Sequence, residues 1–192
     1  MTGSRRVNRS SNAARRGLGA RSRPKAPGKA KRTLTRDNFL STVANVVASG
    51  PVLIAALLRP KTSRALREKV ILGVTAINDC RYCRWGHTHL AMAHGVTLEE
   101  VNQILGLQRE TLQAQDRAEA AAILFAQHYA ENFDHFDQES MESLRSHYSD
   151  AQVREIIAYV RAITLGNLAG NTVDAFLDCL RGNSWSNAGK PE

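Results

Sequence analysis

Residues 67–94, REKVILGVTAINDCRYCRWGHTHLAMAH, contain the pattern C-x-x-C-x-x-x-H, formed by Cys80, Cys83 and His87. If Cys80 begins a helix, the advance of about 100° per residue places Cys83 about 60° from Cys80 and His87 about 40° from Cys83. Two thiols and an imidazole then share one face of this helix. We interpret the rest of the chain as the scaffold for this face or as a tail.

The position of the two thiols at a helix start indicates redox chemistry. A cysteine reacts as its thiolate, and the free N–H groups and the dipole of a helix N-terminus lower the pKa of a thiol. Cys80 and Cys83 lie in the first turn after Asn78-Asp79. His87, one turn after Cys83, can act as a base toward a thiol or stabilise its anion. The second thiol can trap a sulfenic acid as a disulfide before over-oxidation.

Glu68 is predicted to lie level with His87. If the helices on either side of Asn78-Asp79 pack antiparallel, Glu68 lies roughly 15 Å back along one axis and His87 roughly 12 Å along the other, at about 1.5 Å per residue. A carboxylate beside an imidazole fixes its tautomer and raises its basicity. The alternative is an ordinary acid in the first turn of a helix, where the macrodipole favours it.

Apolar residues recur at three- and four-residue spacings along most of the chain, which is typical of helices. No segment combines period-two alternation with hairpin turns, and no repeat occurs at solenoid spacing. We therefore expect an all-α, multi-helix domain over residues 37–185 and a short tail over 186–192. The predicted helices cover about residues 35–49, 51–60, 64–78, 80–94, 98–108, 115–132, 140–147, 150–168 and 173–181.

Capping signals support several of these helix starts. Ser63 is a predicted N-cap. Thr97 with Glu100, and Ser149 with Gln152, have the spacing of capping boxes.

Two breaks are predicted inside apolar segments. Gly50 ends the first helix, and Pro51 suits the first turn of the next. Asn171-Thr172 is predicted to cap the last helix. Asn167 and Asn171 have a second interpretation, as polar contacts between helices.

The first 36 residues form a separate basic arm. They contain 12 Lys or Arg and no Asp or Glu, so the net charge of +8 splits into +12 for residues 1–36 and −4 for the rest. This composition cannot bury enough apolar surface to offset the ordering entropy, so we expect disorder. Three interpretations stay open: a solvated tail, a tether to nucleic acid or an anionic surface, and, in a eukaryote, a transit segment.

Length, cysteine count and hydropathy limit the class of protein. The 192 residues, 43% of them apolar, suffice for one domain. Three cysteines, two of them in one motif, do not make a secreted disulfide framework and fit a reducing compartment. The most apolar stretch, residues 46–58, is short and is interrupted by Ser49-Gly50-Pro51. We therefore expect a soluble, cytoplasmic protein without a transmembrane segment, or an organellar one if the arm is a transit segment.

Three other interpretations of the cysteine motif compete with redox chemistry. A zinc site could use Cys80, Cys83, His87 and His89, but structural zinc sites usually take their second ligand pair from a distant segment, and His89 falls about 200° from His87 around the helix. A thioredoxin fold needs βαβ units, which the pattern lacks. Two buried thiols near a surface histidine are the plainest alternative.

The spacing E-x(11)-C-x-x-C-x-x-x-H resembles that of the AhpD-like alkylhydroperoxidases of the carboxymuconolactone decarboxylase superfamily. Glu68, Cys80, Cys83 and His87, followed by Thr88, supply the pattern, and the resemblance spans about residues 66–101. It implies an AhpD-like, all-α, homo-oligomeric protein that has neither a metal nor an organic cofactor. It also implies a hydroperoxide substrate and an external dithiol reductant, which is a lipoyl-bearing protein for AhpD itself.

The resemblance also implies a role for each residue. Cys83 would attack the peroxide, and Cys80 would resolve the product and face the reductant. His87 would be the base and Glu68 its partner. Tyr82 stands where AhpD has a histidine of its proton relay, and a phenol, with an ordinary pKa near 10, is a poor base at neutral pH. The decarboxylase branch of the superfamily lacks the cysteine pair, so decarboxylation is not carried over.

Three hypotheses for function follow. The first is a thiol-dependent hydroperoxide reductase that acts as an antioxidant peroxidase. The second is a general thiol–disulfide oxidoreductase on the same fold. The third is a helical binding module whose Cys/His cluster holds zinc and whose basic arm holds nucleic acid.

The remaining cysteine, histidines and tryptophan of interest give weaker signals. Cys179, in the last predicted helix, is expected to be a small buried residue. Trp85 could wall an apolar peroxide pocket, or anchor the core or a subunit contact. His89 and His94 could border the site. Three scattered histidines indicate no site, namely His128, His135 and His147.

Overall fold

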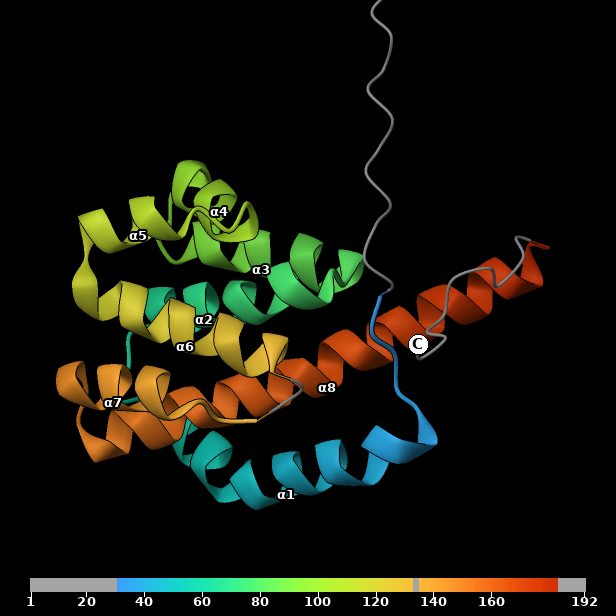
Figure 1. Cartoon of the computed structure of the whole chain (residues 1–192), viewed down its shortest axis with the longest axis horizontal. Helices are drawn as coiled ribbons and strands as arrows, with labels where there is room; N and C mark the ends of the chain where they lie inside the picture. The colour runs from blue at the N-terminus through green and yellow to red at the C-terminus, as the bar shows by residue number, and fades with distance from the viewer. Residues whose placement is uncertain (1–30, 133–134, 183–192) are drawn as a thin grey trace, which may run out of the picture.

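The computed structural model describes residues 31–132 and 135–182, and every regular element in these ranges is an α-helix (Figure 1). In chain order the helices are α1 (Arg36–Leu58), α2 (Arg64–Asn78), α3 (Arg81–Ala93), α4 (Leu98–Leu105), α5 (Arg109–Gln115), α6 (Arg117–Glu131), α7 (Gln138–His147) and α8 (Asp150–Leu180). The all-α prediction is therefore confirmed. The predicted tail over 186–192, and residues 1–30 of the predicted arm, lie outside the described residues.

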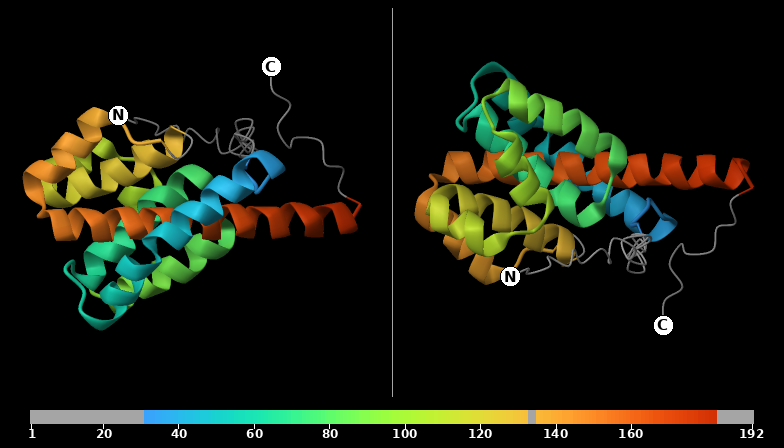
Figure 2. Two further views of the ribbon diagram at one scale, coloured as in Figure 1. Left: turned by 90° about the horizontal axis from the view of Figure 1, so that it is seen from below. Right: turned by 90° about the horizontal axis from the view of Figure 1, so that it is seen from above.

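The helix α8 is 31 residues long and packs against several other helices. α1, α2 and α3 all pack against it, and α2 also packs against α6. Both views of Figure 2 show the C-terminal end of α8 projecting beyond the other helices. The larger core lies between α2, α6 and α8, where Val70, Phe125 and Val160 are buried.

A second hydrophobic core packs against the other side of α2. It joins α2 to α4 and α6 through the buried residues Leu72, Ile104 and Ile123. Because Val70 faces one core and Leu72 the other, α2 is enclosed on two sides and cannot shift without disturbing both. The side chains that α2 contributes to a site are therefore held in fixed positions.

A short turn connects α2 to α3. Ser63 caps α2, and its side chain accepts a hydrogen bond from the backbone N–H of Leu66 at 3.0 Å. Asp79 ends α2 in the left-handed region (φ 52°), a conformation that aspartate tolerates better than most residues. Cys80 is the N-cap of α3, and Gly95 follows the end of α3 with φ 87°. The helices predicted on both sides of Asn78-Asp79 are therefore confirmed.

The predicted break at Gly50 and Pro51 is wrong, because α1 continues through both residues. Proline has no N–H, so the carbonyl of Val47 loses its helical donor. Val47 and Pro51 both lie on the exposed side of α1. Water can hydrate a carbonyl there, so the helix tolerates the proline.

The predicted cap at Asn171-Thr172 is also wrong, because α8 continues through it. Thr172 Oγ1 donates a hydrogen bond to the carbonyl of Leu168 at 2.8 Å, within the helix. Asn171 Nδ2 donates to the carbonyl of Asn78 at 2.7 Å. Asn171 thus makes a polar contact between helices, which was its second interpretation.

Both predicted capping boxes are confirmed, at Thr97 and at Ser149. α4 nevertheless ends at Leu105, earlier than predicted, where Gly106 is its C-cap and Leu107 takes a positive φ of 56°. The next segment forms α5, for which no helix was predicted. Its seven residues are too few to show a clear helical period.

The helix α1 turns most of its large apolar side chains away from the core. Its buried residues are Thr42, Ser49 and Ala56, which are small and lie seven positions apart, and it packs against α8. Its large exposed residues are Phe39, Leu40, Val47, Ile54, Leu57 and Leu58. Within residues 31–132 and 135–182, α1 is the one helix long and apolar enough, by length and composition, to cross a membrane. The predicted break at Gly50, on which the expectation of no transmembrane segment depended, is absent from α1.

The last residues of the predicted arm contact the helices. The Lys31 ammonium lies 3.2 Å from Asp174 Oδ2, and the backbone N–H of Leu34 donates to Thr172 Oγ1 at 2.9 Å. The residues just before α1 are therefore attached to α8.

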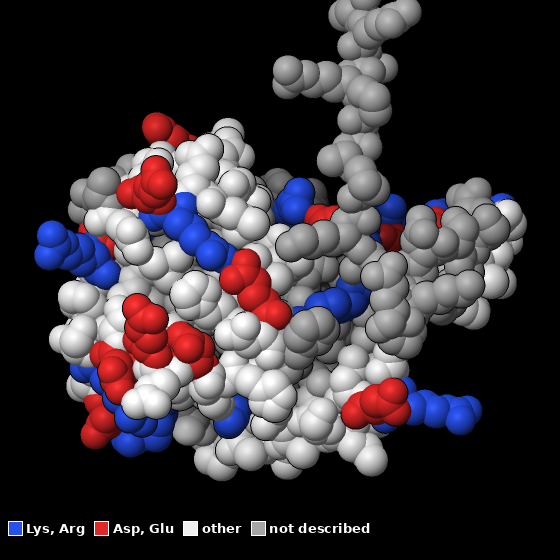
Figure 3. Space-filling view, viewed as in Figure 1, with Lys and Arg blue, Asp and Glu red and all other residues white. Residues whose placement is uncertain are grey.

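Charged side chains are mixed on the face of the molecule seen in Figure 3. Acidic and basic residues alternate there over the described part of the chain. This face therefore lacks the basic stripe that marks a nucleic-acid-binding surface.

Candidate active site

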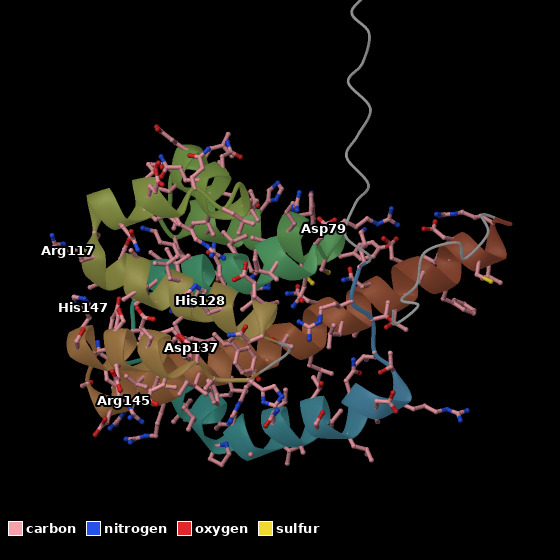
Figure 4. All side chains as sticks on the ribbon, viewed as in Figure 1. Asp79, Arg117, His128, Asp137, Arg145 and His147 are labelled. Atoms are coloured by element: carbon pink, nitrogen blue, oxygen red, sulfur yellow. The ribbon has the colours of Figure 1, made fainter. Side chains whose placement is uncertain are left out.

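Cys80 and Cys83 lie together at the N-terminus of α3, as predicted. The Cys80 Sγ accepts a hydrogen bond from the backbone N–H of Cys83, with an N–Sγ distance of 3.3 Å. Both residues are free cysteines. The Cys80 side chain is completely buried, whereas Cys83 is half-buried. Cys83 is therefore the more accessible of the two cysteines. Figure 4 labels Asp79, which lies in the turn just before Cys80.

The two thiols differ in their affinity for a proton. A hydrogen bond from the Cys83 thiol lowers the pKa of Cys80 to about 6, with help from the backbone N–H groups of Cys83 and Tyr82 and from the charge of Lys31. The same hydrogen bond raises the pKa of Cys83 far above that of an ordinary thiol, and burial and the Cys80 charge add to this rise. In the reduced pair at neutral pH, Cys80 therefore carries the negative charge and Cys83 the proton.

Glu68 and His87 lie side by side, as the helix geometry predicts. Glu68 Oε2 is 2.7 Å from His87 Nδ1, and Arg67 donates two hydrogen bonds to the other carboxylate oxygen, at 2.8 and 2.9 Å. Burial alone would raise the pKa of Glu68, but the hydrogen bonds from His87 and Arg67 outweigh it and hold this pKa below its ordinary value. A charged carboxylate at Nδ1 leaves the other ring nitrogen, Nε2, free to exchange a proton.

A polar cluster on α8 fastens the start of α3, and the sequence interpretation missed most of it. Asp174 lies 2.6 Å from the Arg81 guanidinium and 3.2 Å from the Lys31 ammonium. Asn171 holds the carbonyl of Asn78, two residues before Cys80. These residues carry no local motif, and the only sequence signal was the pair of asparagines on an otherwise apolar helix.

Tyr82 lies beside the cysteines and contacts Arg81. The Arg81 guanidinium is 4.8 Å from the centre of the Tyr82 ring and donates to the phenol oxygen at 2.7 Å. Arg81 thus joins Tyr82 to Asp174. Tyr82 is the residue at the position where the AhpD-like pattern has a relay histidine.

The four residues of the zinc hypothesis do not converge. His87 is paired with Glu68, and the His89 Nδ1 lies 2.8 Å from the carbonyl of Trp85. In the described part of the chain, no three Cys, His, Asp or Glu side chains are grouped so as to hold a metal ion.

Trp85 is mostly exposed and does not wall the cysteines. It lines a surface groove of about 380 Å³ between α3 and α4, to which neither Cys80 nor Cys83 contributes.

Cys179 is exposed, so its prediction as a buried residue is wrong. It lies in the projecting part of α8, where no core is present to cover it. Figure 4 labels His128 and His147 well away from Asp79, in agreement with their lack of a predicted role.

The fold and the site define a helical protein with a cysteine pair and a Glu–His pair on a two-helix hairpin. Residues 52–127 match the model of the carboxymuconolactone decarboxylase family. The match covers Glu68, both motif cysteines and His87 but none of α8. Neither the curated proteins nor the solved structures compared with the chain gave a significant match.

Proposed function

We propose that this protein is an AhpD-like, thiol-dependent hydroperoxide reductase. The observation that supports it most is the Glu68–His87 contact of 2.7 Å, because it places an oriented imidazole one turn from Cys83 and its neighbouring thiolate. Structural cysteines need no such base. The match of residues 52–127 to the carboxymuconolactone decarboxylase family model is compatible with this activity.

In the first step, the Cys83 proton passes to His87, and Cys80 stays a thiolate. The Cys83 thiolate then attacks the distal oxygen of the hydroperoxide. An S–O bond forms and the O–O bond breaks, which leaves Cys83 as a sulfenic acid and releases an alkoxide. His87, oriented by Glu68, supplies the proton that turns the alkoxide into an alcohol.

In the second step, the Cys80 thiolate attacks the sulfur of the Cys83 sulfenic acid. An S–S bond forms, the S–O bond breaks, and the hydroxide leaves as water after taking a proton. An external dithiol, either a small molecule or a lipoyl-type group on a partner protein, then reduces the disulfide through a mixed disulfide and is itself oxidised.

Peroxide consumption by the purified protein tests the proposal. Several hydroperoxides are combined with several dithiols, and wild type is compared with Cys83→Ser, Cys80→Ser and, as a matched control, Cys179→Ser. We expect turnover in wild type and Cys179→Ser, and its loss in the two motif variants. Equal peroxide consumption in all four proteins would overturn the proposal.

A second candidate is a general thiol–disulfide oxidoreductase. Tyr82 favours it, because a phenol replaces the relay histidine while the lowered pKa of Cys80 is retained. This activity would appear as exchange with disulfide substrates at rates well above peroxide consumption. The ratio of disulfide exchange to peroxide consumption in the wild-type protein separates the two candidates.

We also propose that the protein is a homo-oligomer. The support is the apolar face of α1, which carries Leu40, Val47, Ile54 and Leu57 on its exposed side. Monomeric proteins seldom expose so long an apolar face, and a second copy of the chain would cover it.

A further inference from the structure

The helix α8 passes close to the cysteine pair at Gly170. A Cβ placed on Gly170 would lie 2.7 Å from the Cys80 Sγ, 3.7 Å from Tyr82 Cδ2 and 3.8 Å from the Cys83 Sγ. Real Cβ atoms essentially never come within 3.0 Å of another heavy atom. The Cys80 sulfur therefore occupies space that any other residue at position 170 would fill.

Backbone conformation does not explain this glycine. Gly170 lies inside a continuous helix, where glycine is less favourable than alanine, and it is not among the glycines with positive φ. Gly166, one turn earlier on α8, offers a comparison, since the nearest atom to its Cβ position is Ile163 Cδ1 at an ordinary 3.7 Å.

The helix α8 is also unable to move away from the cysteines at low cost. Asn171 holds the Asn78 carbonyl at 2.7 Å, and Asp174 holds Arg81 at 2.6 Å. These contacts flank Cys80 in the sequence and lie within one turn of Gly170 on α8. A side chain at position 170 would therefore displace the Cys80 sulfur rather than the helix.

We propose that Gly170 is a positioning residue of the redox centre, because its missing side chain makes the space that keeps the Cys80 sulfur against the backbone N–H of Cys83. The cysteine motif of α3 thus functions only together with a residue of α8 that lies ninety positions after Cys80 in the chain. The inference deepens the proposed function, but its geometry does not depend on which oxidant the pair reduces.

The charged and titratable groups around Cys80 come from three elements, and Gly170→Ala alters none of them. They are Arg81, Tyr82 and Cys83 on α3, Asp174 on α8, and Lys31. A change in the titration of the thiols in this variant therefore reports the position of the sulfur.

The test is a thiolate titration by ultraviolet absorbance in a Cys179→Ser background. Gly170→Ala is compared with Gly166→Ala as the matched control. We expect the first thiol step, near pH 6 in the parent protein, to rise by about one pH unit in Gly170→Ala, since the sulfur loses its N–H donor. The step should not move in Gly166→Ala. An unchanged step in Gly170→Ala would overturn the proposal.

Thermal unfolding provides a second readout that requires no activity. Gly170→Ala should lower the unfolding temperature when Cys80 is present, and should leave it unchanged or raise it in a Cys80→Ala background, where the sulfur is gone. An equal loss in both backgrounds would show that the clash is not with Cys80 and would overturn the proposal. Absence of peroxide turnover in every variant, with the titration shift present, would reject the proposed function and leave the role of Gly170 intact.

Discussion

Glu68 and His87 are nineteen positions apart in the chain, yet Glu68 Oε2 lies 2.7 Å from His87 Nδ1. The contact joins α2 to α3 across the turn at Asp79, and it fixes the imidazole one turn beyond Cys83. Because Glu68 is buried and also bound by Arg67, the carboxylate has little freedom to release the ring. The base of the proposed reaction is therefore oriented before any substrate arrives.

Glu68→Gln should slow peroxide reduction at neutral pH by about tenfold, and His87→Ala by about a hundredfold. Glutamine keeps the size of the side chain but removes the carboxylate charge that orients the His87 ring. The deficit should shrink as pH rises above the pKa of the reactive thiol, since the thiolate then forms without help. Rate–pH profiles of the two variants measure this.

The double variant of Glu68 and His87 is the control for this prediction. It should be little slower than His87→Ala alone, since residues that act as one unit are not additive. Losses that multiply would mean that Glu68 does not act through His87.

The free energy of unfolding should also report the Glu68 contacts. The pKa of Glu68 is lower in the folded protein than its ordinary value, so its stabilising effect is complete above that value and disappears as pH falls through the folded one. Glu68→Gln should therefore cost about 1–3 kcal/mol at neutral pH and progressively less below about pH 4. Urea unfolding at several pH values measures the difference; a cost that does not vary with pH would contradict it.

Removal of residues 2–30 should leave peroxide turnover unchanged, whereas removal of residues 2–34 should slow it. The longer deletion takes away Lys31, whose charge helps to lower the pKa of Cys80, and the Leu34 contact with Thr172. The effect should weaken in high salt, because Lys31 is partly exposed. Lys31→Gln in the full chain separates the charge from the rest of the segment, and equal rates for both deletions would refute this prediction.

Glu155→Ala should lower the free energy of unfolding by about 3 kcal/mol without changing the thiol titration. Glu155 is buried and accepts hydrogen bonds from the backbone N–H groups of Lys61 and Thr62, from the Thr62 hydroxyl and from Tyr159. Tyr159→Phe removes only one of these bonds and should cost about 1 kcal/mol. A shift in the thiol titration would show that this cluster reaches the redox centre.

Leu40→Glu combined with Leu57→Glu should dissociate the proposed oligomer, because a charge on the exposed apolar face of α1 would have to be buried. Light scattering coupled to size-exclusion chromatography measures the mass in solution. Gln113→Glu, at an exposed position on α5, adds a negative charge away from this face and should have no effect. A wild-type protein that is monomeric at all concentrations would contradict the proposal.

The site residues on α2 and α3 could be predicted from the sequence because their geometry is local. One turn separates the two helices, so the helical rise alone places Glu68 level with His87. The position of Cys80 as N-cap follows in the same way from the break at Asn78-Asp79.

The contribution of α8 could not be predicted, because it depends on how distant segments pack. Gly170 and Asp174 acquire their roles only through contact with the start of α3. The errors at Pro51 and Asn171 have the same origin, since each residue resembles a helix boundary locally and is accommodated by its surroundings in the fold.

Lys31, held by its ion pair with Asp174, couples the charge on the cysteine pair to the attachment of the N-terminal segment. If the docked Lys31 stabilises the Cys80 thiolate, the thiolate stabilises the docked Lys31 by the same free energy. Disulfide formation removes that negative charge, so Asp174 must then hold Lys31 alone. Each round of disulfide formation and reduction would thus loosen and tighten the attachment of the segment to α8. An anionic surface that draws the segment away would favour the oxidised pair.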